Sequence, residues 1–313
     1  MKNTLFKKGF VVGIIILFVG VVVIPSNANF LNINISTDDE VFSIPMDSRN
    51  IIYVDDDNTG GPWDGTLEHP YQYIQDGVDN AGKGDMVYVF NGTYYECIVI
   101  GKSYLKLVGE NVYSTIIDGK GCNSVILIGT NSNYVHICKF TIKNGNYGIR
   151  CYSDYNQIYK NNIFDNNKGI DIYNSNHCKV FRNYIHNNRG GGITIMGTLN
   201  IITNNDIRNS SRGILTDTSY LGTIEKNNFI NNTQNAFFIQ YHRFGFSNKW
   251  KRNYWDDWGG IGPQLISGRL VIFNPDNPYY PPKYFDLRNY DWFPAKKPYK
   301  IIITNNIEGC GIE

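Results

Sequence analysis

Three basic side chains in the middle of the chain share one position in a repeat of 22 residues. Lys160, Arg182 and Lys226 recur in this register, and Tyr159 stands one place before the first of them. Cations pair with carboxylates and aromatic faces stack on pyranose rings, so the pattern predicts a strip that binds acidic sugars. The alternative interpretation is a solvated strand face, which normally carries the same residue types.

The same repeat offers candidates for catalysis. A lyase acting on an acidic polysaccharide must neutralise a uronate carboxylate and remove a neighbouring proton, and Arg182 and His186 are the candidate catalytic residues. The acids fit less well, because neither Asp165 nor Asp206 shares its repeat position with a second acid. Register alone therefore assembles no glycosidase carboxylate pair and no metal site, and Ca²⁺ is retained only as a possible cofactor.

The repeat itself predicts the fold. Asn161, Asn183, Asn205 and Asn227 recur at the same spacing, each followed two positions later by isoleucine or phenylalanine. Segments this rich in Asn, β-branched residues and turn formers do not suit helical repeats, and the leucines of leucine-rich repeats are missing. We predict an all-β, single-stranded right-handed parallel β-helix of about 22 residues per coil. The asparagines are expected to stack at a sharp turn in left-handed backbone, with their amides bonded along the axis.

The ends of the solenoid are expected to be capped, because open ends expose core and strand edges. Apolar residues between Pro70 and Ala81 keep helical spacing and predict an N-terminal capping helix. At the other end, Trp250, Trp255 and Trp258 indicate either a packed aromatic cap or a sugar-stacking platform with an open ring face. The predicted segments are 1–28 (signal peptide or membrane anchor), 29–49 (linker), 50–248 (β-helix with N-terminal cap), 249–300 (C-terminal cap) and 301–313 (tail).

The N-terminus and the composition suggest an exported protein. Lysines precede an apolar run over residues 9–24 and a small-x-small site that ends at Ala28, as in a signal peptide, although an uncleaved membrane anchor is the alternative. A net charge of +1 argues against a nucleic-acid partner. The six cysteines show no metal-ligand spacing, and Cys97 with Cys122 could either bridge or remain buried thiols.

The sequence resembles the NosD-like proteins, which are exported pectin-lyase-like β-helix proteins that include many archaeal surface proteins. The resemblance covers almost all of 51–300 and implies the fold and an extracellular or cell-surface location. The family name also implies a role in copper-site maturation. The histidines and methionines, which could bind copper, occupy different repeat positions in this chain. The motifs that carry it are Tyr53-Val-Asp-Asp-Asp57, Gly65-Thr66, His69-Pro70-Tyr71, Gly84-Asp85-Met-Val-Tyr-Val89, Gly92-Thr-Tyr94, Glu96 and Asn253-Tyr254-Trp255.

Four functions are consistent with these patterns. The leading expectation is a non-catalytic module that binds extracellular polysaccharide or envelope glycan, or mediates adhesion, through Lys160, Arg182, Lys226, Tyr159 and the tryptophans. The alternative is a lyase or glycoside hydrolase acting on acidic polysaccharide. A purely structural envelope role predicts no exposed aromatic groove, and the minor alternative is copper-site maturation. The fold alone does not distinguish them.

Overall fold

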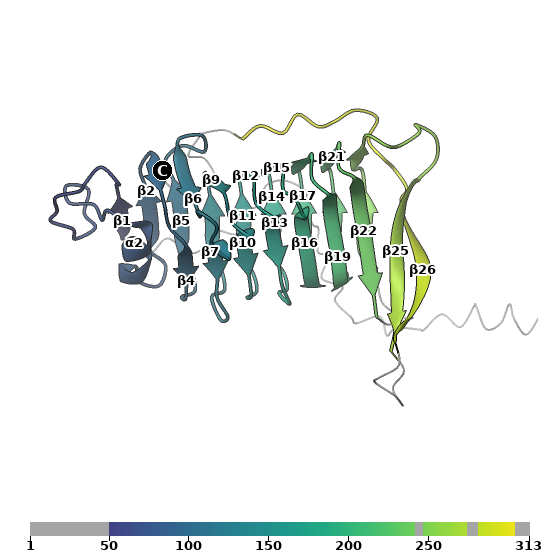
Figure 1. Cartoon of the computed structure of the whole chain (residues 1–313), viewed down its shortest axis with the longest axis horizontal. Coiled ribbons are helices and arrows are strands. Elements are labelled where there is room, and N and C mark those ends of the chain that lie inside the picture. The colour runs from purple at the N-terminus through teal and green to yellow at the C-terminus, as the bar shows by residue number, and fades with distance from the viewer. Residues whose placement is uncertain (1–49, 242–246, 274–280, 304–313) are drawn as a thin grey trace, which may run out of the picture. The chain divides into compact units, whose positions relative to one another are not determined.

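The computed structural model describes residues 50–241, 247–273 and 281–303. Short parallel strands from successive coils stack into three sheets, as Figure 1 shows. This arrangement is the right-handed parallel β-helix predicted from the repeat. The described strands of sheet A are β1 (Ile51–Val54), β2 (Met86–Val89), β5 (Lys106–Gly109), β8 (His136–Cys138), β11 (Gln157–Tyr159), β14 (Lys179–Phe181), β17 (Ile201–Thr203), β20 (Thr223–Glu225) and β23 (Lys249–Lys251).

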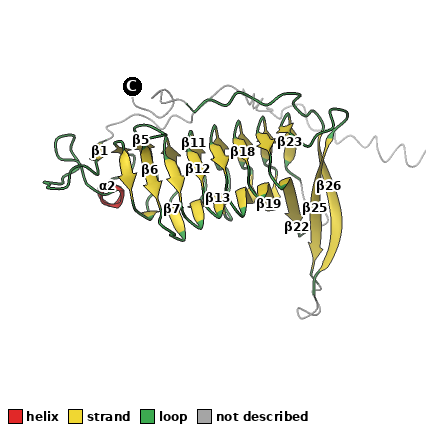
Figure 2. Ribbon diagram, turned by 45° about the horizontal axis from the view of Figure 1, so that its top comes forward, coloured by secondary structure: helices red, strands yellow, loops and turns green. Residues whose placement is uncertain are grey.

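The other two sheets complete each coil, and Figure 2 shows that strands make up nearly all the regular structure. Sheet B contains β3 (Gly92–Tyr94), β6 (Thr115–Asp118), β9 (Thr141–Lys143), β12 (Asn162–Phe164), β15 (Tyr184–His186), β18 (Asp206–Arg208), β21 (Asn228–Ile230) and β24 (Tyr254–Trp255). Sheet C contains β4 (Ile98–Ile100), β7 (Ser124–Ile128), β10 (Tyr147–Cys151), β13 (Lys168–Ile172), β16 (Gly191–Thr198), β19 (Arg212–Tyr220), β22 (Gln234–Gln240), β25 (Gln264–Ile272) and β26 (Lys283–Asp291).

The 22-residue period corresponds to the pairing register. Ile158 pairs with Val180, Val180 with Ile202, and Ile202 with Ile224, so each repeat places one apolar side chain inside the coil. All four are at most 2 % exposed. Because side chains alternate between the two faces of a strand, the residues on either side of each inner position face outward, where a ligand could meet them.

The asparagine ladder lies at the turn between sheets A and B, and its residues are fully buried. Asn183 Nδ2 donates to Asn205 Oδ1 over 3.0 Å, and Asn161 Nδ2 donates to Asn183 Oδ1 over 3.1 Å. The predicted amide bonding along the axis is therefore confirmed. The predicted left-handed backbone at these asparagines is wrong, because the left-handed residue is the one before each, such as Arg182 with φ of 55°. Each asparagine comes directly after this left-handed residue, and its side-chain amide forms hydrogen bonds with the buried backbone groups of the turn.

The predicted N-terminal capping helix is α2 (Ile74–Asn80), which buries Ile74, Gly77 and Val78 against the first coils. The Glu96 carboxylate accepts hydrogen bonds from the backbone N–H groups of Ile74 (2.8 Å) and Gln75 (2.9 Å). These two N–H groups have no partner within the helix, and an acid at this end also complements the helix dipole. One side chain thus fixes the cap to the coil that carries β4.

At the C-terminal end, β23, β24 and β25 continue the three sheets past residue 248, where the sequence analysis places the start of the cap. The antiparallel strand β26 then closes sheet C. Its last residue, Asp291, is fully buried and accepts hydrogen bonds from the Asn253 backbone N–H (2.9 Å) and the Trp255 indole (3.1 Å). A single carboxylate therefore fixes β26 to the last coil.

Two further expectations concern the compartment. Cys97 and Cys122 form a disulfide, with 6.1 Å between their Cα atoms. Outside the gaps at 242–246 and 274–280, residues 50–303 contain no helix long and apolar enough to cross a membrane. The predicted signal or anchor (1–28) and linker (29–49) lie outside the described residues.

Candidate functional site

The predicted basic strip lies at the turn between sheets A and B. Lys160, Arg182 and Lys226 all occupy the left-handed turn position, with φ of 54° to 55°. The column is therefore real, but its exposure differs from the expectation, because Lys160 is only 5 % exposed and the other two are half-buried. Tyr159 is 1 % exposed and stacks on Phe181 with 4.8 Å between ring centroids. Little of this strip is open to a polymer from solvent.

The predicted tryptophan cluster forms part of the cap. Trp250 and Trp255 are 5 % and 2 % exposed, and the Trp255 ring stacks on Phe229 at 4.5 Å inside the last coil. Trp258 is partly buried, and its indole N–H donates to the Gly262 carbonyl over 3.1 Å. A sugar-stacking platform needs an open ring face, and Trp250 and Trp255 offer none.

His186, predicted as a general base, projects from the outer face of sheet B. Its ring lies 4.2 Å from that of Tyr184 and 4.9 Å from that of Phe164, centroid to centroid. Burial lowers the pKa of His186 and outweighs the charges of Asp165 and Asp206, which raise it, while the charge of Arg208 adds to the lowering. The ring therefore favours the neutral form at pH 7. Its Nε2 lies 3.1 Å from Asn162 Oδ1, an acceptor, so Nε2 carries the proton and Nδ1 keeps its lone pair.

The cation that acts on His186 comes from the next coil. His186 pairs in register with Arg208, whereas Arg182 lies at the turn before β15. The Arg208 guanidinium binds both carboxylate oxygens of Asp206, with Nη2 to Oδ2 at 2.7 Å, and this pairing raises the pKa of Arg208. The structure thus places Arg208, and not Arg182, in register with His186. We call Asn162, Phe164, Tyr184, His186, Asp206 and Arg208 the sheet B cluster.

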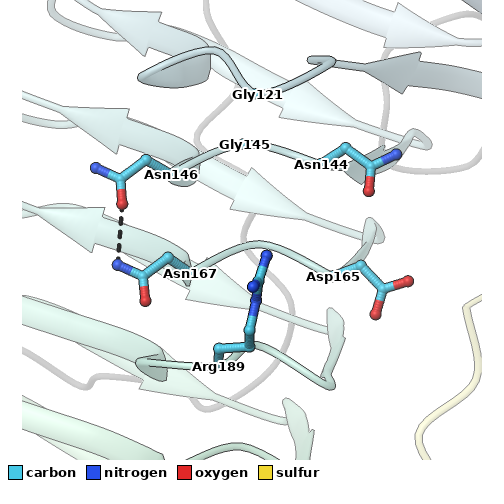
Figure 3. A pocket seen from close by; sticks show the side chains of 7 residues that line it. All are labelled: Gly121, Asn144, Gly145, Asn146, Asp165, Asn167 and Arg189. Carbon is cyan, nitrogen blue, oxygen red and sulfur yellow. Dashed lines mark hydrogen bonds between the residues drawn. The ribbon is translucent and has the colours of Figure 1, made fainter.

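A groove of about 510 Å³ opens beside this cluster, at the turn between sheets B and C. We call it the B–C groove; the residues lining it are Gly121, Asn144, Gly145, Asn146, Asp165, Asn167 and Arg189. Figure 3 shows the exposed Arg189 side chain extending across the neighbouring coil, between Asn167 and Asp165.

The amides of the groove are already aligned. Asn167 Nδ2 donates to Asn146 Oδ1 over 2.9 Å, and Asn146 Nδ2 donates to Asn123 Oδ1 over 3.2 Å. Each amide keeps a further donor and acceptor capacity. At Gly145 an added Cβ would come within 2.5 Å of the buried Val125 side chain, so this turn packs closely against the coil interior. The lining therefore presents hydrogen-bonding groups along the solenoid axis.

A second cluster begins on the other side of the groove, on the outer face of sheet C. Tyr147 and Lys168 directly follow Asn146 and Asn167 in the chain. Arg150 Nε lies 3.0 Å from Asp171 Oδ2, and Lys168 Nζ lies 3.6 Å from Asp171 Oδ1. We call Tyr147, Arg150, Tyr152, Lys168, Asp171 and Tyr173 the sheet C cluster.

Aromatic rings surround the Arg150 guanidinium, which lies 4.2 Å from the Tyr147 centroid, 4.8 Å from that of Tyr152 and 5.4 Å from that of Tyr173. Asp171 is only 2 % exposed, and the cations that balance its charge are Arg150 and Lys168 of the same cluster. The six residues of the sheet C cluster therefore carry one positive charge in excess, and Asp217 on β19 also interacts with Lys168. The surface beside the groove is thus cationic and aromatic.

The acids of these faces are not arranged as a catalytic pair. Asp171 aligns with Thr194 and then Leu215, and Asp217 lies two residues further on. Two strand spacings and two residues place the Cα atoms of Asp171 and Asp217 roughly 12 Å apart. The two acids therefore do not align across adjacent coils. Within the described residues, no group of three or more His, Cys, Asp or Glu is placed to hold a metal ion.

Sequence reasoning missed Arg208, Arg189 and the groove amides. Arg208 follows His186 by one period, so a column-by-column search for cations would have found it. The amides Asn123, Asn146 and Asn167 are less visible, because their spacings differ from 22 where the turns change length. A strict period does not align them.

The fold and the open groove define the class of protein: a right-handed parallel β-helix with a polar surface groove. Residues 124–268 match the family model described as the right handed beta helix region. A search of curated protein sequences finds no match.

Solved structures share the architecture at low sequence identity. Pectin methylesterase from carrot superposes with a TM-score of 0.48 and 11 % identity, covering 66 % of this chain and 82 % of its own. An alginate lyase from Paenibacillus sp. gives 0.44 and 14 %, covering 66 % and 88 %. Pectin methylesterase PemA from Erwinia chrysanthemi gives 0.44 and 11 %, covering 82 % and 92 %. These similarities concern the fold and assign no residue of the site.

Proposed function

We propose that this protein is an exported glycan-binding module that holds an acidic polysaccharide along the B–C groove without cleaving it. The observation that carries the proposal is the groove itself, in which amides and Arg189 line a polar channel parallel to the solenoid axis. This replaces the basic strip of Lys160, Arg182 and Lys226 as the main contact surface, because that strip is largely buried.

The groove suits a sugar chain chemically. Sugar hydroxyls both donate and accept hydrogen bonds, as the side-chain amides of Asn146 and Asn167 do. The Arg189 guanidinium can bind a uronate carboxylate through two parallel hydrogen bonds. Asp165 lies in the same groove and is exposed, so it can accept from hydroxyls. The groove thus holds one cation and one carboxylate, and the preference for an acidic over a neutral glycan comes from the positive charge of the neighbouring sheet C cluster.

The flanking clusters extend this surface. Tyr147 and Tyr173 stand beside Arg150 in the sheet C cluster, and Tyr173 is 39 % exposed. Aromatic faces of this kind stack on sugar rings, and the uncompensated positive charge attracts carboxylates. A polymer several sugars long would contact the groove and the sheet C cluster together.

Binding without cleavage is favoured by the state of the acids. Asp206 is held by Arg208 and Asp171 by Arg150 and Lys168, so both carboxylates are engaged in ion pairs. A general acid needs a raised pKa and a free proton. Burial does raise the pKa of Asp217, but this group lies roughly 12 Å from Asp171.

Export is part of the proposal. The Cys97–Cys122 disulfide supports it, because disulfides persist in oxidising compartments outside the cytoplasm. The predicted signal at 1–28 is consistent with this location, and an uncleaved segment 9–24 would instead attach the protein to the membrane.

The test mixes the purified full-length protein with neutral dextran, polygalacturonate or alginate, with and without Ca²⁺, and follows protein and polymer by size-exclusion chromatography. Co-elution with the acidic polymers at unchanged polymer size is expected. Binding to dextran alone, or to none of the polymers, would contradict the proposal.

One observation favours a second candidate, a lyase acting on acidic polysaccharide. His186 favours the neutral form, keeps a lone pair on Nδ1 and stands next to Arg208, which together resemble a base beside a carboxylate-neutralising cation. A lyase would shorten the polymer and release unsaturated uronates that absorb in the ultraviolet, and His186→Gln would abolish the product. No absorbance change with wild-type protein rejects this candidate.

A further inference from the structure

The C-terminal edge of sheet C is a long, exposed strand. In the described residues β26 pairs with β25 alone, along nine residues. Tyr284 is 61 % exposed and Phe285 42 %, and Asp286 and Arg288 are exposed as well. An edge strand leaves a row of backbone N–H and C=O groups able to pair with another strand. This edge is the outer end of sheet C in Figure 1.

The sequence of β26 is complementary to itself when reversed. If two copies pair antiparallel with Leu287 opposite Leu287, then Asp286 of each copy lies opposite Arg288 of the other, and Tyr284 lies opposite Tyr290. Asp286 and Arg288 are two positions apart and so project from the same face. Each strand therefore presents a carboxylate where its copy presents a guanidinium, and the match occurs twice by symmetry.

The remaining charges do not oppose this pairing. Asp286 and Arg288 form no ion pair with any residue that the structure describes, but Asp286 lies directly opposite Arg269 of β25. Asp286 therefore has one cation on its β25 side and would meet a second on its open side. Asp291, at the end of the strand, is engaged with Asn253 and Trp255 and takes no part. The Tyr290 N–H donates to Asn289 Oδ1 over 2.8 Å, so the Tyr284–Tyr290 pair contributes through its rings and not through this N–H. Charged residues on an edge usually discourage pairing, because like charges meet when strands approach. Here the order of charges produces attraction in the antiparallel arrangement.

We propose that β26 is a self-association surface through which two copies of this chain join their C sheets into one continuous sheet. The partner is a second copy of the chain, because the charge pattern is its own complement. Opposite-charge and aromatic cross-strand pairs contribute about 0.2 to 1 kcal/mol each, and the contact is short. The dimer is thus weak and depends on protein concentration.

The test is sedimentation velocity on the full-length protein across about 1 to 100 µM, the range suited to a small interface. Wild type is expected to shift from monomer to dimer. Arg288→Asp and Asp286→Arg, each alone, place like charges opposite one another twice and should remain monomeric. When these two variants are mixed, every pair is again of opposite charge, and dimers should return.

The mixing step separates a broken interface from a misfolded chain, since variants that form the mixed dimer must be folded. The matched control is Lys83→Asp, which makes the same change of charge at an exposed site near the other end of the solenoid and should dimerise like wild type. Monomeric wild type at every concentration would overturn the proposal. So would dimers in either single variant, or no dimer in the mixture.

Discussion

Asn183 is the position where the ladder between sheets A and B is most open to a quantitative test. Its side chain takes part in five hydrogen-bond contacts. The two N–H groups of Nδ2 are shared among the carbonyls of Ile158 (2.9 Å) and Phe181 (3.1 Å) and Asn205 Oδ1 (3.0 Å), and Oδ1 accepts from the backbone N–H and the Nδ2 of Asn161 (both 3.1 Å). The residue is fully buried. Water therefore cannot replace these bonds.

Asn183→Ala removes all five contacts and leaves at least the Asn161 N–H and one carbonyl buried without their present partner. Each buried unsatisfied group costs about 1 to 3 kcal/mol, so we expect the free energy of unfolding to fall by about 3 to 5 kcal/mol. Guanidinium unfolding followed by near-ultraviolet circular dichroism measures this loss.

The matched control is Asn162→Ala, at the start of β12 in the preceding coil. This side chain faces outward, is half-buried, and donates to the Thr141 hydroxyl over 3.2 Å. Its removal should cost less than about 1 kcal/mol. A loss at Asn183 no larger than that at Asn162 would refute the claim that the ladder stabilises the coil.

Three further predictions concern other parts of the chain. Replacing Cys97 and Cys122 by serine removes a cross-link between residues 25 apart and should lower the free energy of unfolding by about 3.5 kcal/mol; equal stability of oxidised and reduced wild type would contradict this. Gly145→Ala brings a Cβ within 2.5 Å of a side chain and should cost about 1 to 3 kcal/mol, whereas Gly101→Ala meets nothing within 4 Å and should be nearly neutral; equal melting temperatures would refute the packing argument. The pKa of His186 is lowered in the folded state, so the unfolded chain binds more protons and stability should fall as the pH drops below about 6.5. His186→Gln should flatten this part of the curve of stability against pH, and an unchanged curve would show that His186 is not responsible.

The coil interior could be predicted because every repeat solves the same packing problem. Ile158, Val180, Ile202 and Ile224 share one register, and their spacing alone located the strands of sheet A. The left-handed position could not be read in the same way. Lysine and arginine have no strong preference for it, and the buried amide of the next residue determines it.

The exposed surface was harder to predict than the core. Tyr159 points outward from its strand, yet it packs with Met86, Val108 and Cys138 and is 1 % exposed. The alternation of side chains along a strand predicts which face a side chain points to. It does not predict whether neighbouring residues bury that side chain. The groove was not predicted for a different reason: Asn146 and Asn167 lie in turns whose lengths vary from coil to coil.

The most direct test of the proposed function is the binding isotherm of full-length wild-type protein with polygalacturonate, measured beside the variant that combines Asn167→Ala with Arg189→Ala. We expect saturable binding by wild type with no shortening of the polymer. In the variant, affinity should fall at least about tenfold, the effect of one lost charge-assisted hydrogen bond. Equal affinity of the two proteins would contradict the placement of the glycan in the B–C groove.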